Sequence, residues 1–186
     1  MRKVTVQPTN LPITLATAKE IARIEHDYDD AIINSMIKSA CKTAESFTGI
    51  QLTTGTFIEA LPSFATQINL LSPLQSVTSV KYYDSSNVQQ IVASSNYRIY
   101  TFGKSHYIEF DENYSFPAVY NRSDAVQIEF VAGYATTPED IASWIAIRVV
   151  TLYENREEFV SGYGTLSKID EKYLNQFLYP YKIFKW

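Results

Sequence analysis

The sequence predicts an α+β fold, a helical core interrupted by an inserted antiparallel β-rich region. Apolar residues recur with helical spacing in residues 12–49 and 137–179, whereas residues 50–134 alternate with a period of two. The chain has 186 residues, of which 46% are hydrophobic and 19% charged, a composition typical of a chain with a folded core. We therefore expect a single domain over residues 1–186, with an extended C-terminal tail at 180–186.

Two helices are expected before the β-rich region. Thr14 is a candidate N-cap for the first helix. Asp27 is a candidate N-cap for the second, with Asp30 three residues later, and Gly49 ends it. Cys41, the one cysteine, falls on the apolar face of this helix, so we expect a core residue rather than a nucleophile or a disulfide partner.

Short runs rich in Val, Ile, Tyr and Phe predict the strands of the β-rich region. They are residues 56–61, 66–71, 76–84, 88–93, 96–101, 106–110 and 125–134. Turn-forming residues separate the runs, and a longer loop precedes the last one. This spacing predicts an antiparallel meander of five to seven strands.

Helical spacing returns after the strands. Thr137 is a candidate N-cap and Pro138 suits the first helical position. This helix is apolar on more than one side, so it is either central in its own domain or covered by a neighbouring subunit. Arg148 interrupts the apolar surface and would need a carboxylate or carbonyl partner when covered. A final helix near residues 169–178 is expected to stop at Pro180.

The charge pattern limits the classes of partner. The net charge is −4 and the chain has no Lys/Arg run, which argues against tight binding of nucleic acid. No apolar run approaches about 18 residues, and the N-terminus lacks the apolar segment of a signal peptide. We expect no membrane partner and a protein made in the cytoplasm. The 14 tyrosines fit either an interface or ordinary strands.

No motif indicates catalysis. His26 lies in an acidic stretch with Asp27 and Asp30, but helix capping accounts for both carboxylates, so no metal site is expected. His106 lies in a strand pattern, and no phosphate-binding, nucleophile-elbow or paired-cysteine motif occurs. We expect no catalytic residue, cofactor or metal. A small hydrolase would need a pocket that gathers either histidine with an acid and a nucleophile.

Four ordered stretches carry a resemblance to a known family. They are "PITLATAKEIARIEHDYDDAIINSMIKSACKTAESFTG", "LSPLQSVTSVKYYD", "VQIEFVAGY" and "AIRVVTLYENRE", with a weaker match in "FLYPYK". Together they resemble the phage head–tail connector family, whose members are also called adaptor or head completion proteins. The closing "IFKW" departs from the family pattern.

The resemblance implies a structural virion protein with a helical core and a β-rich insertion. Such adaptors form a ring of about twelve subunits beneath the portal. The implied partners are the portal protein, neighbouring adaptor subunits and a downstream neck, stopper or tail protein. Double-stranded DNA would pass through the ring without specific binding. A different possibility is a β-rich tail or baseplate module that uses its tyrosines on a ligand.

Two sets of residues are candidates for assembly contacts. The subunit-interface candidates are Arg148, Tyr153 and Arg156. The portal-binding candidates alternate apolar and basic side chains at the end of the sequence: Tyr181, Lys182, Ile183, Phe184, Lys185 and Trp186. The aromatic residues of this tail should be covered, either by the β layer of the same subunit or by the portal.

Overall fold

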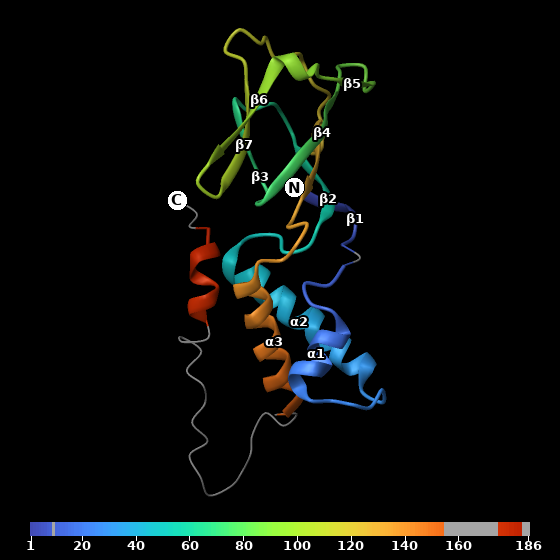
Figure 1. Cartoon of the computed structure of the whole chain (residues 1–186). Coiled ribbons are helices and arrows are strands. Elements are labelled where there is room, and N and C mark those ends of the chain that lie inside the picture. Colours follow the sequence, from blue (N-terminus) through green and yellow to red (C-terminus); the bar gives the residue numbers. More distant parts are fainter. Residues whose placement is uncertain (9, 155–174, 184–186) are drawn as a thin grey trace, which may run out of the picture. The chain divides into compact units, whose positions relative to one another are not determined.

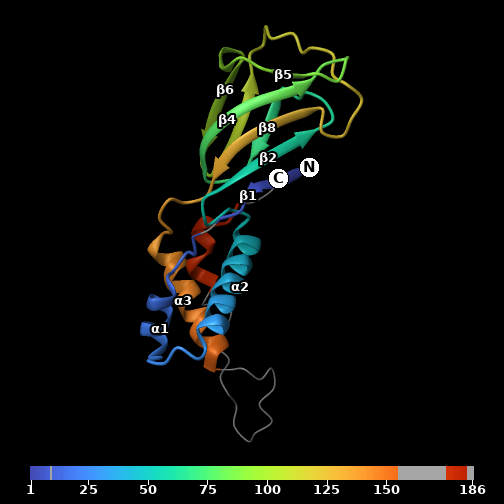
Figure 2. The same cartoon turned by 90° about the vertical axis from the view of Figure 1, so that its right-hand side faces the viewer.

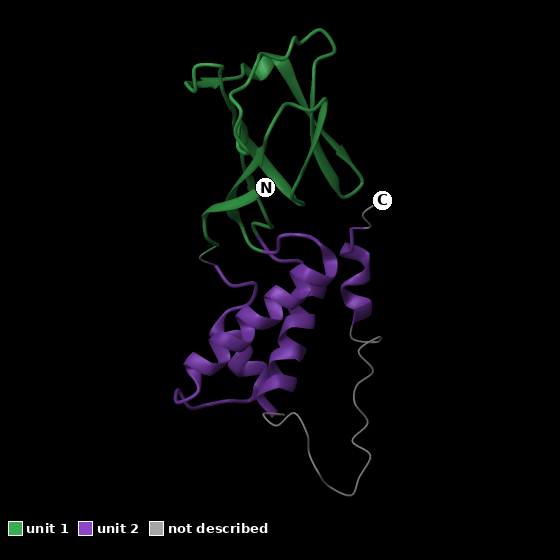
Figure 3. Ribbon diagram, turned by 180° about the vertical axis from the view of Figure 1, so that it is seen from behind, with its two compact units in different colours: residues 1–9, 53–135 green, residues 10–52, 136–186 purple. Residues whose placement is uncertain are grey.

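The computed structural model describes residues 1–8, 10–154 and 175–183, and the chain divides into two compact units (Figure 3). Unit 1, the β unit, comprises Met1–Thr9 and Thr53–Ala135. Unit 2, the helical unit, comprises Asn10–Leu52 and Thr136–Trp186. The α+β class predicted from the sequence is confirmed. That the whole chain acts as one domain stays a prediction.

The β unit contains two antiparallel sheets. Its elements are β1 (Arg2–Val6), β2 (Gly55–Leu61), β3 (Gln67–Leu70), β4 (Leu74–Tyr83), β5 (Gln89–Ile91), the short 3-10 helix η1 (Ser94–Asn96), β6 (Tyr97–Phe102), β7 (Ser105–Phe110) and β8 (Val126–Ala132). One sheet has the order β1-β2-β8-β4-β5 and the other β3-β7-β6. All seven strands expected from the sequence are present, each close to its predicted range.

The predicted meander is wrong because the last strand lies inside its sheet. β8 pairs with β2 on one side and with β4 on the other (Figure 2). Its side chains alternate between buried and half-buried, and Phe130 faces both Phe57 of β2 and Val77 of β4. The neighbours on both sides supply hydrogen-bond partners for the backbone N–H and C=O groups of this largely buried strand. Sequence spacing carries no information about these distant partners.

β1 is an additional strand that the sequence patterns did not indicate. All five of its residues are exposed, and it lies at the edge of the five-stranded sheet beside β2. The Nε of Arg2 donates to Oε2 of Glu59 at 2.6 Å. The alternation in this segment is limited to Val4 and Val6 on either side of Thr5, which is too short a run to predict a strand.

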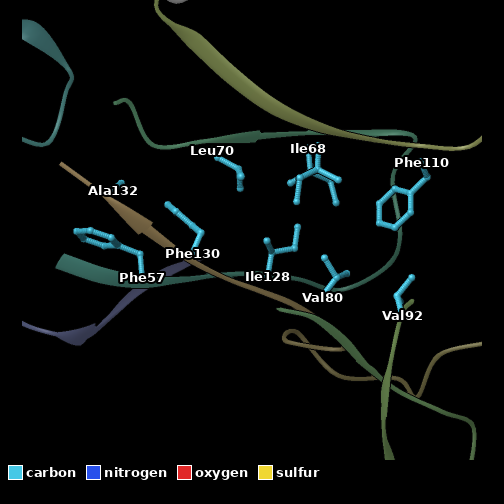
Figure 4. Close-up of a cluster of buried hydrophobic side chains, with 10 residues drawn as sticks. Phe57, Ile68, Leu70, Val80, Val92, Phe110, Ile128, Phe130 and Ala132 are labelled. Carbon is cyan, nitrogen blue, oxygen red and sulfur yellow. The ribbon is translucent and has the colours of Figure 1, made fainter. Parts of the chain in front are cut away.

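The core of the β unit lies between its two sheets (Figure 4). Ile68 and Leu70 of β3 point toward Ile128 and Phe130 of β8. The rings of Phe57 and Phe130 stack with their centroids 5.8 Å apart. In both sheets, every second side chain points into this core. This period of two fits a strand and not a helix, which is why these segments form strands.

The helical unit contains α1 (Leu15–Ala22), α2 (Asp30–Thr48) and α3 (Glu139–Glu154), followed by the 3-10 turns η2 (Asn175–Phe177) and η3 (Tyr179–Tyr181) (Figure 1). Thr14 caps α1 as predicted, because its hydroxyl accepts the backbone N–H of Thr17 at 3.0 Å. Gly49 ends α2 with a φ of 76°, a left-handed conformation that suits glycine. Most of the predicted final helix lies outside the described residues.

Two further expectations for α2 concern its N-cap and its cysteine. Asp27 does not cap the helix: Asp29 occupies the N-cap position, and Asp27 forms an ion pair with Lys19 instead. Cys41 is buried, and burial raises the pKa of its thiol to about 12. The prediction that this cysteine is a core residue is confirmed by its burial.

Candidate assembly surfaces of the helical unit

The segment 175–183 packs against α2 and α3 of its own chain. Leu178 is completely buried in this unit. The ring of Tyr179 meets that of Phe47 of α2 edge to face, with centroids 5.5 Å apart. The C-terminal part of the chain therefore helps to close the helical core, although it is remote in sequence from α2.

The candidates at the end of this segment also contact the helices. Lys182 places its Nζ 4.6 Å from the ring centroid of Phe47, and the backbone N–H of Ile183 donates to the carbonyl of Thr48 at 2.8 Å. The hydroxyl of Tyr181 donates to Oδ2 of Asp140 at 3.4 Å. Burial, and then the nearby carboxylate, raises the pKa of the Tyr181 hydroxyl.

The described part of the C-terminal segment differs in conformation from the expected extended tail. Pro180 lies within η3 rather than ending a longer helix, and the chain becomes extended at Lys182. Within the helical unit, residues 181–183 contact α2 and α3. Phe184, Lys185 and Trp186 lie outside the described residues. Portal binding by any of the six candidates stays a prediction.

α3 buries most of its apolar stripe within its own unit. Ile141, Trp144, Ile145 and Val149 are buried, whereas Ile147 and other residues on its remaining sides are half-buried. The sequence left open whether α3 is central in its own unit or covered by a neighbour. The main stripe is covered within the chain, and apolar side chains on a second side are still partly exposed.

The three interface candidates on and after α3 have different surroundings. Tyr153 is half-buried, and its hydroxyl donates to Oδ2 of Asp29 at 2.7 Å, so it joins the end of α3 to the start of α2. Arg148 is half-buried, and none of the described residues forms an ion pair or hydrogen bond with its side chain. Arg156 lies outside the described residues.

The mostly buried side chain of Lys19 forms two ion pairs across the turn between α1 and α2. Lys19, 14% exposed, places its Nζ 2.5 Å from Oδ1 of Asp27 and 2.8 Å from Oδ1 of Asp30. The hydrogen bond from Lys19 lowers the pKa of the Asp27 carboxyl, and the two carboxylates raise the pKa of Lys19. Sequence reasoning missed this three-residue network because its members come from both sides of the turn.

The two histidines take part in local contacts. His26 packs its ring against Tyr28, with centroids 5.4 Å apart. His106 of β7 shares a hydrogen bond of 3.0 Å with the hydroxyl of Thr101 on β6, and burial lowers the pKa of its imidazole. Within the part of the chain that the structure describes, no three His, Cys, Asp or Glu side chains gather as metal ligands. No described helix has the length and apolarity needed to cross a bilayer.

The family model of the head completion protein matches residues 12–165, and the chain belongs to this family. The resemblance to phage head–tail connectors seen in the sequence is therefore confirmed.

Solved structures with the same fold come from gene transfer agent (GTA) particles. A chain in the neck of an empty GTA particle, computed with C6 symmetry, is 18% identical with a TM-score of 0.78, covering 100% of this chain and 97% of that chain. A chain in the virion of a native GTA particle gives the same values. A chain in the native neck, computed with C12 symmetry, is 19% identical with a TM-score of 0.71 and the same coverage. At these identities the likeness shows the fold. No curated protein matches the sequence.

Proposed function

We propose that this protein is a non-enzymatic head–tail adaptor of the virion neck, which forms a ring of about twelve subunits beneath the portal. The observation that carries the proposal is the match of the head completion family model to residues 12–165. The full-length likeness in fold to chains from GTA necks supports it. The ring extends the DNA channel and offers a platform to the next neck, stopper or tail protein.

The charge of the chain suits a channel that does not retain DNA. Each subunit carries a net charge of −4, so a ring of subunits repels the phosphate backbone overall. Clustered cations would instead form ion pairs with phosphates and resist the passage of the duplex. DNA is therefore a passing molecule rather than a bound partner in this proposal.

Portal docking is proposed for the end of the sequence. Leu178 and Ile183 fix the segment 175–183 on the helical unit through burial and a backbone hydrogen bond to Thr48. We propose that this fixed segment serves as a mount from which Phe184, Lys185 and Trp186 reach the portal. In this proposal Tyr181 and Lys182 help to fix the segment on the helices, through their contacts with Asp140 and Phe47. Aromatic side chains are effective anchors in a partner's pockets.

Electron microscopy and pull-down with the cognate portal test this proposal. The full chain should form a ring coaxial with the portal. A variant lacking residues 184–186 should keep its melting temperature and lose portal binding. A variant with Lys104→Ala in the β6–β7 turn is the control and should bind like the unaltered chain. If the protein at high concentration stays a free monomer in the presence of portal, the adaptor proposal is wrong.

A further inference from the structure

The turn between α1 and α2 exposes unusually large apolar side chains. Tyr28 is 91% exposed, and Ile21 and Ile32, on the two sides of the turn, are 49% and 45% exposed. Single exposed apolar residues are common, but three on one short turn are typical of a surface that meets a partner. Tyrosine in particular contributes strongly at the centres of protein interfaces.

This turn, residues 21–32, is also well ordered by its contacts. Lys19 bridges Asp27 and Asp30, and Tyr153 of α3 donates to Asp29. The backbone N–H of Arg23 donates to carbonyls at the end of α1. A turn that is already fixed loses little conformational entropy when a partner binds, so its exposed side chains contribute more of their contact energy to affinity.

The charge of the turn defines the chemistry of the partner. Turn 21–32 contains one arginine, Arg23, and four carboxylates, those of Glu25, Asp27, Asp29 and Asp30, so its net charge is −3 (1 − 4). Glu25 is exposed and forms no ion pair within the described ranges 1–8, 10–154 and 175–183. An apolar contact beside these carboxylates would remove water from them. The partner surface should therefore combine apolar side chains with a cation.

α3 offers such a surface on the same unit. Arg148 is half-buried without an ion-pair partner among the described residues, and Ile147 and Val150 beside it are half-buried apolar residues. A guanidinium stays charged at all relevant pH values, so covering it requires a carboxylate or carbonyl. The α3 surface and the turn are thus complementary in charge and both partly apolar.

The turn 21–32 is bonded to the Tyr153 side of α3, and the second surface lies on the Arg148 side of the same helix. Tyr153 points to Asp29 at the base of the turn. Arg148 precedes Tyr153 by five residues, which rotates its side chain by about 140° around the helix. One subunit can therefore use both surfaces at once with two different neighbours. This is the heterologous contact from which rings are built, rather than the self-complementary contact of a two-fold dimer.

From these observations we infer that the turn 21–32 of one subunit docks on the Arg148 side of α3 in a second copy of this chain, with Tyr28 as the apolar anchor and Glu25 as the carboxylate that meets Arg148. This inference rests on the proposed ring and names its subunit contact. It assigns to Arg148 a carboxylate partner, which its side chain lacks among residues 1–8, 10–154 and 175–183.

A charge exchange tests the contact. The variants are Glu25→Arg, Arg148→Glu and the double variant, studied as full chains by sedimentation with and without portal. Glu112→Arg and Lys38→Glu, which make the same charge changes at exposed positions elsewhere, are the controls. Each single variant should weaken association by about tenfold or more, and the double variant should recover most of the loss. Thermal melting of every variant checks that it folds.

Tyr28→Ala provides a second, independent measurement on an exposed side chain. It should leave the melting temperature unchanged and weaken ring formation by about tenfold or more. Rings that form normally from this variant and from both single charge variants would overturn the docking contact and leave the adaptor function in place. If the unaltered chain forms no ring even with portal, the adaptor proposal itself fails, and the contact fails with it.

Discussion

The β unit and the helical unit close their cores in different ways. In the β unit, β8 lies between β2 and β4, and its inward side chains pack against the second sheet. In the helical unit, Thr14 caps the start of α1 and Gly49 ends α2, and Leu178 from a segment remote in sequence completes the core. One unit depends on backbone pairing between distant strands, the other on side chains added to locally formed helices.

This difference indicates which substitutions should destabilise each unit most. A sheet requires close backbone approach, so the positions of greatest sensitivity are those where a Cβ would separate two strands. A helical core requires filled volume, so the positions of greatest sensitivity are those of large buried side chains. The three variants below test this distinction, from the largest expected effect to the smallest.

Gly133→Ala should cause the largest loss. Gly133 follows β8 with a φ of 114°, and an added Cβ would lie 2.2 Å from the backbone oxygen of Thr53. Strain and backbone displacement together should lower the free energy of unfolding by at least about 3 kcal/mol. Urea unfolding measures the change.

The control for this variant is Gly103→Ala. Gly103 has a φ of 58°, but nothing lies within 4 Å of an added Cβ. Only the left-handed conformation is then unfavourable, and we expect a loss of about 1 kcal/mol. Equal losses at the two glycines would show that backbone conformation, rather than close approach to Thr53, limits the β unit.

Leu178→Ala should cause an intermediate loss. Its side chain is 0% exposed, so truncation should lower the free energy of unfolding by about 2–4 kcal/mol. It should also increase hydrogen exchange at the amide of Ile183, which bonds to Thr48. Phe177→Ala, at a side chain 40% exposed, is the neighbouring control with an expected loss of about 1 kcal/mol or less. Unchanged exchange in Leu178→Ala would contradict the proposed mount.

Lys19→Met should have the smallest effect, and the effect should depend on pH. The pKa of the Asp27 carboxyl is lowered in the folded state by Lys19. Its contribution to stability is therefore present above the unfolded pKa of about 4 and is lost as the pH falls through the lower folded pKa. The stability difference between Lys19→Met and the unaltered chain should shrink below about pH 4.

Unfolding monitored from pH 7 to acid measures this difference. Lys38→Met, an exposed lysine of α2, is the matched control and should show a smaller, nearly constant difference over the same range. A Lys19→Met difference that stays constant down to the acid limit would show that the ion pairs with Asp27 and Asp30 do not stabilise the helical unit.

Much of the fold could be predicted from the sequence because it is decided locally. The Thr14 cap and the Gly49 stop depend on side-chain and backbone chemistry within a few residues, and both were predicted. The strands were recognisable from their alternation. The family could be recognised from four ordered stretches, and the family model confirms it.

The contacts at the candidate surfaces were harder to predict from the sequence. The hydroxyl of Tyr153 donates to Asp29 of the same chain, a contact that the sequence did not indicate, and its place at a subunit interface stays a prediction. Lys19 shows no special pattern in the sequence, although it organises the turn between α1 and α2. Both contacts join segments whose proximity depends on helix packing, which periodicity does not specify.

The sequence by itself determined most of the secondary structure, the α+β class and the family, because periodicity, most caps and motif order are local properties of the chain. Only the tertiary structure decided that β1 is a strand, that β8 is central in its sheet, and that the segment 175–183 packs on α2 and α3. Each of these features is a pairing between remote segments. Its energy arises from surfaces that exist only after both segments have folded, so no local pattern records it.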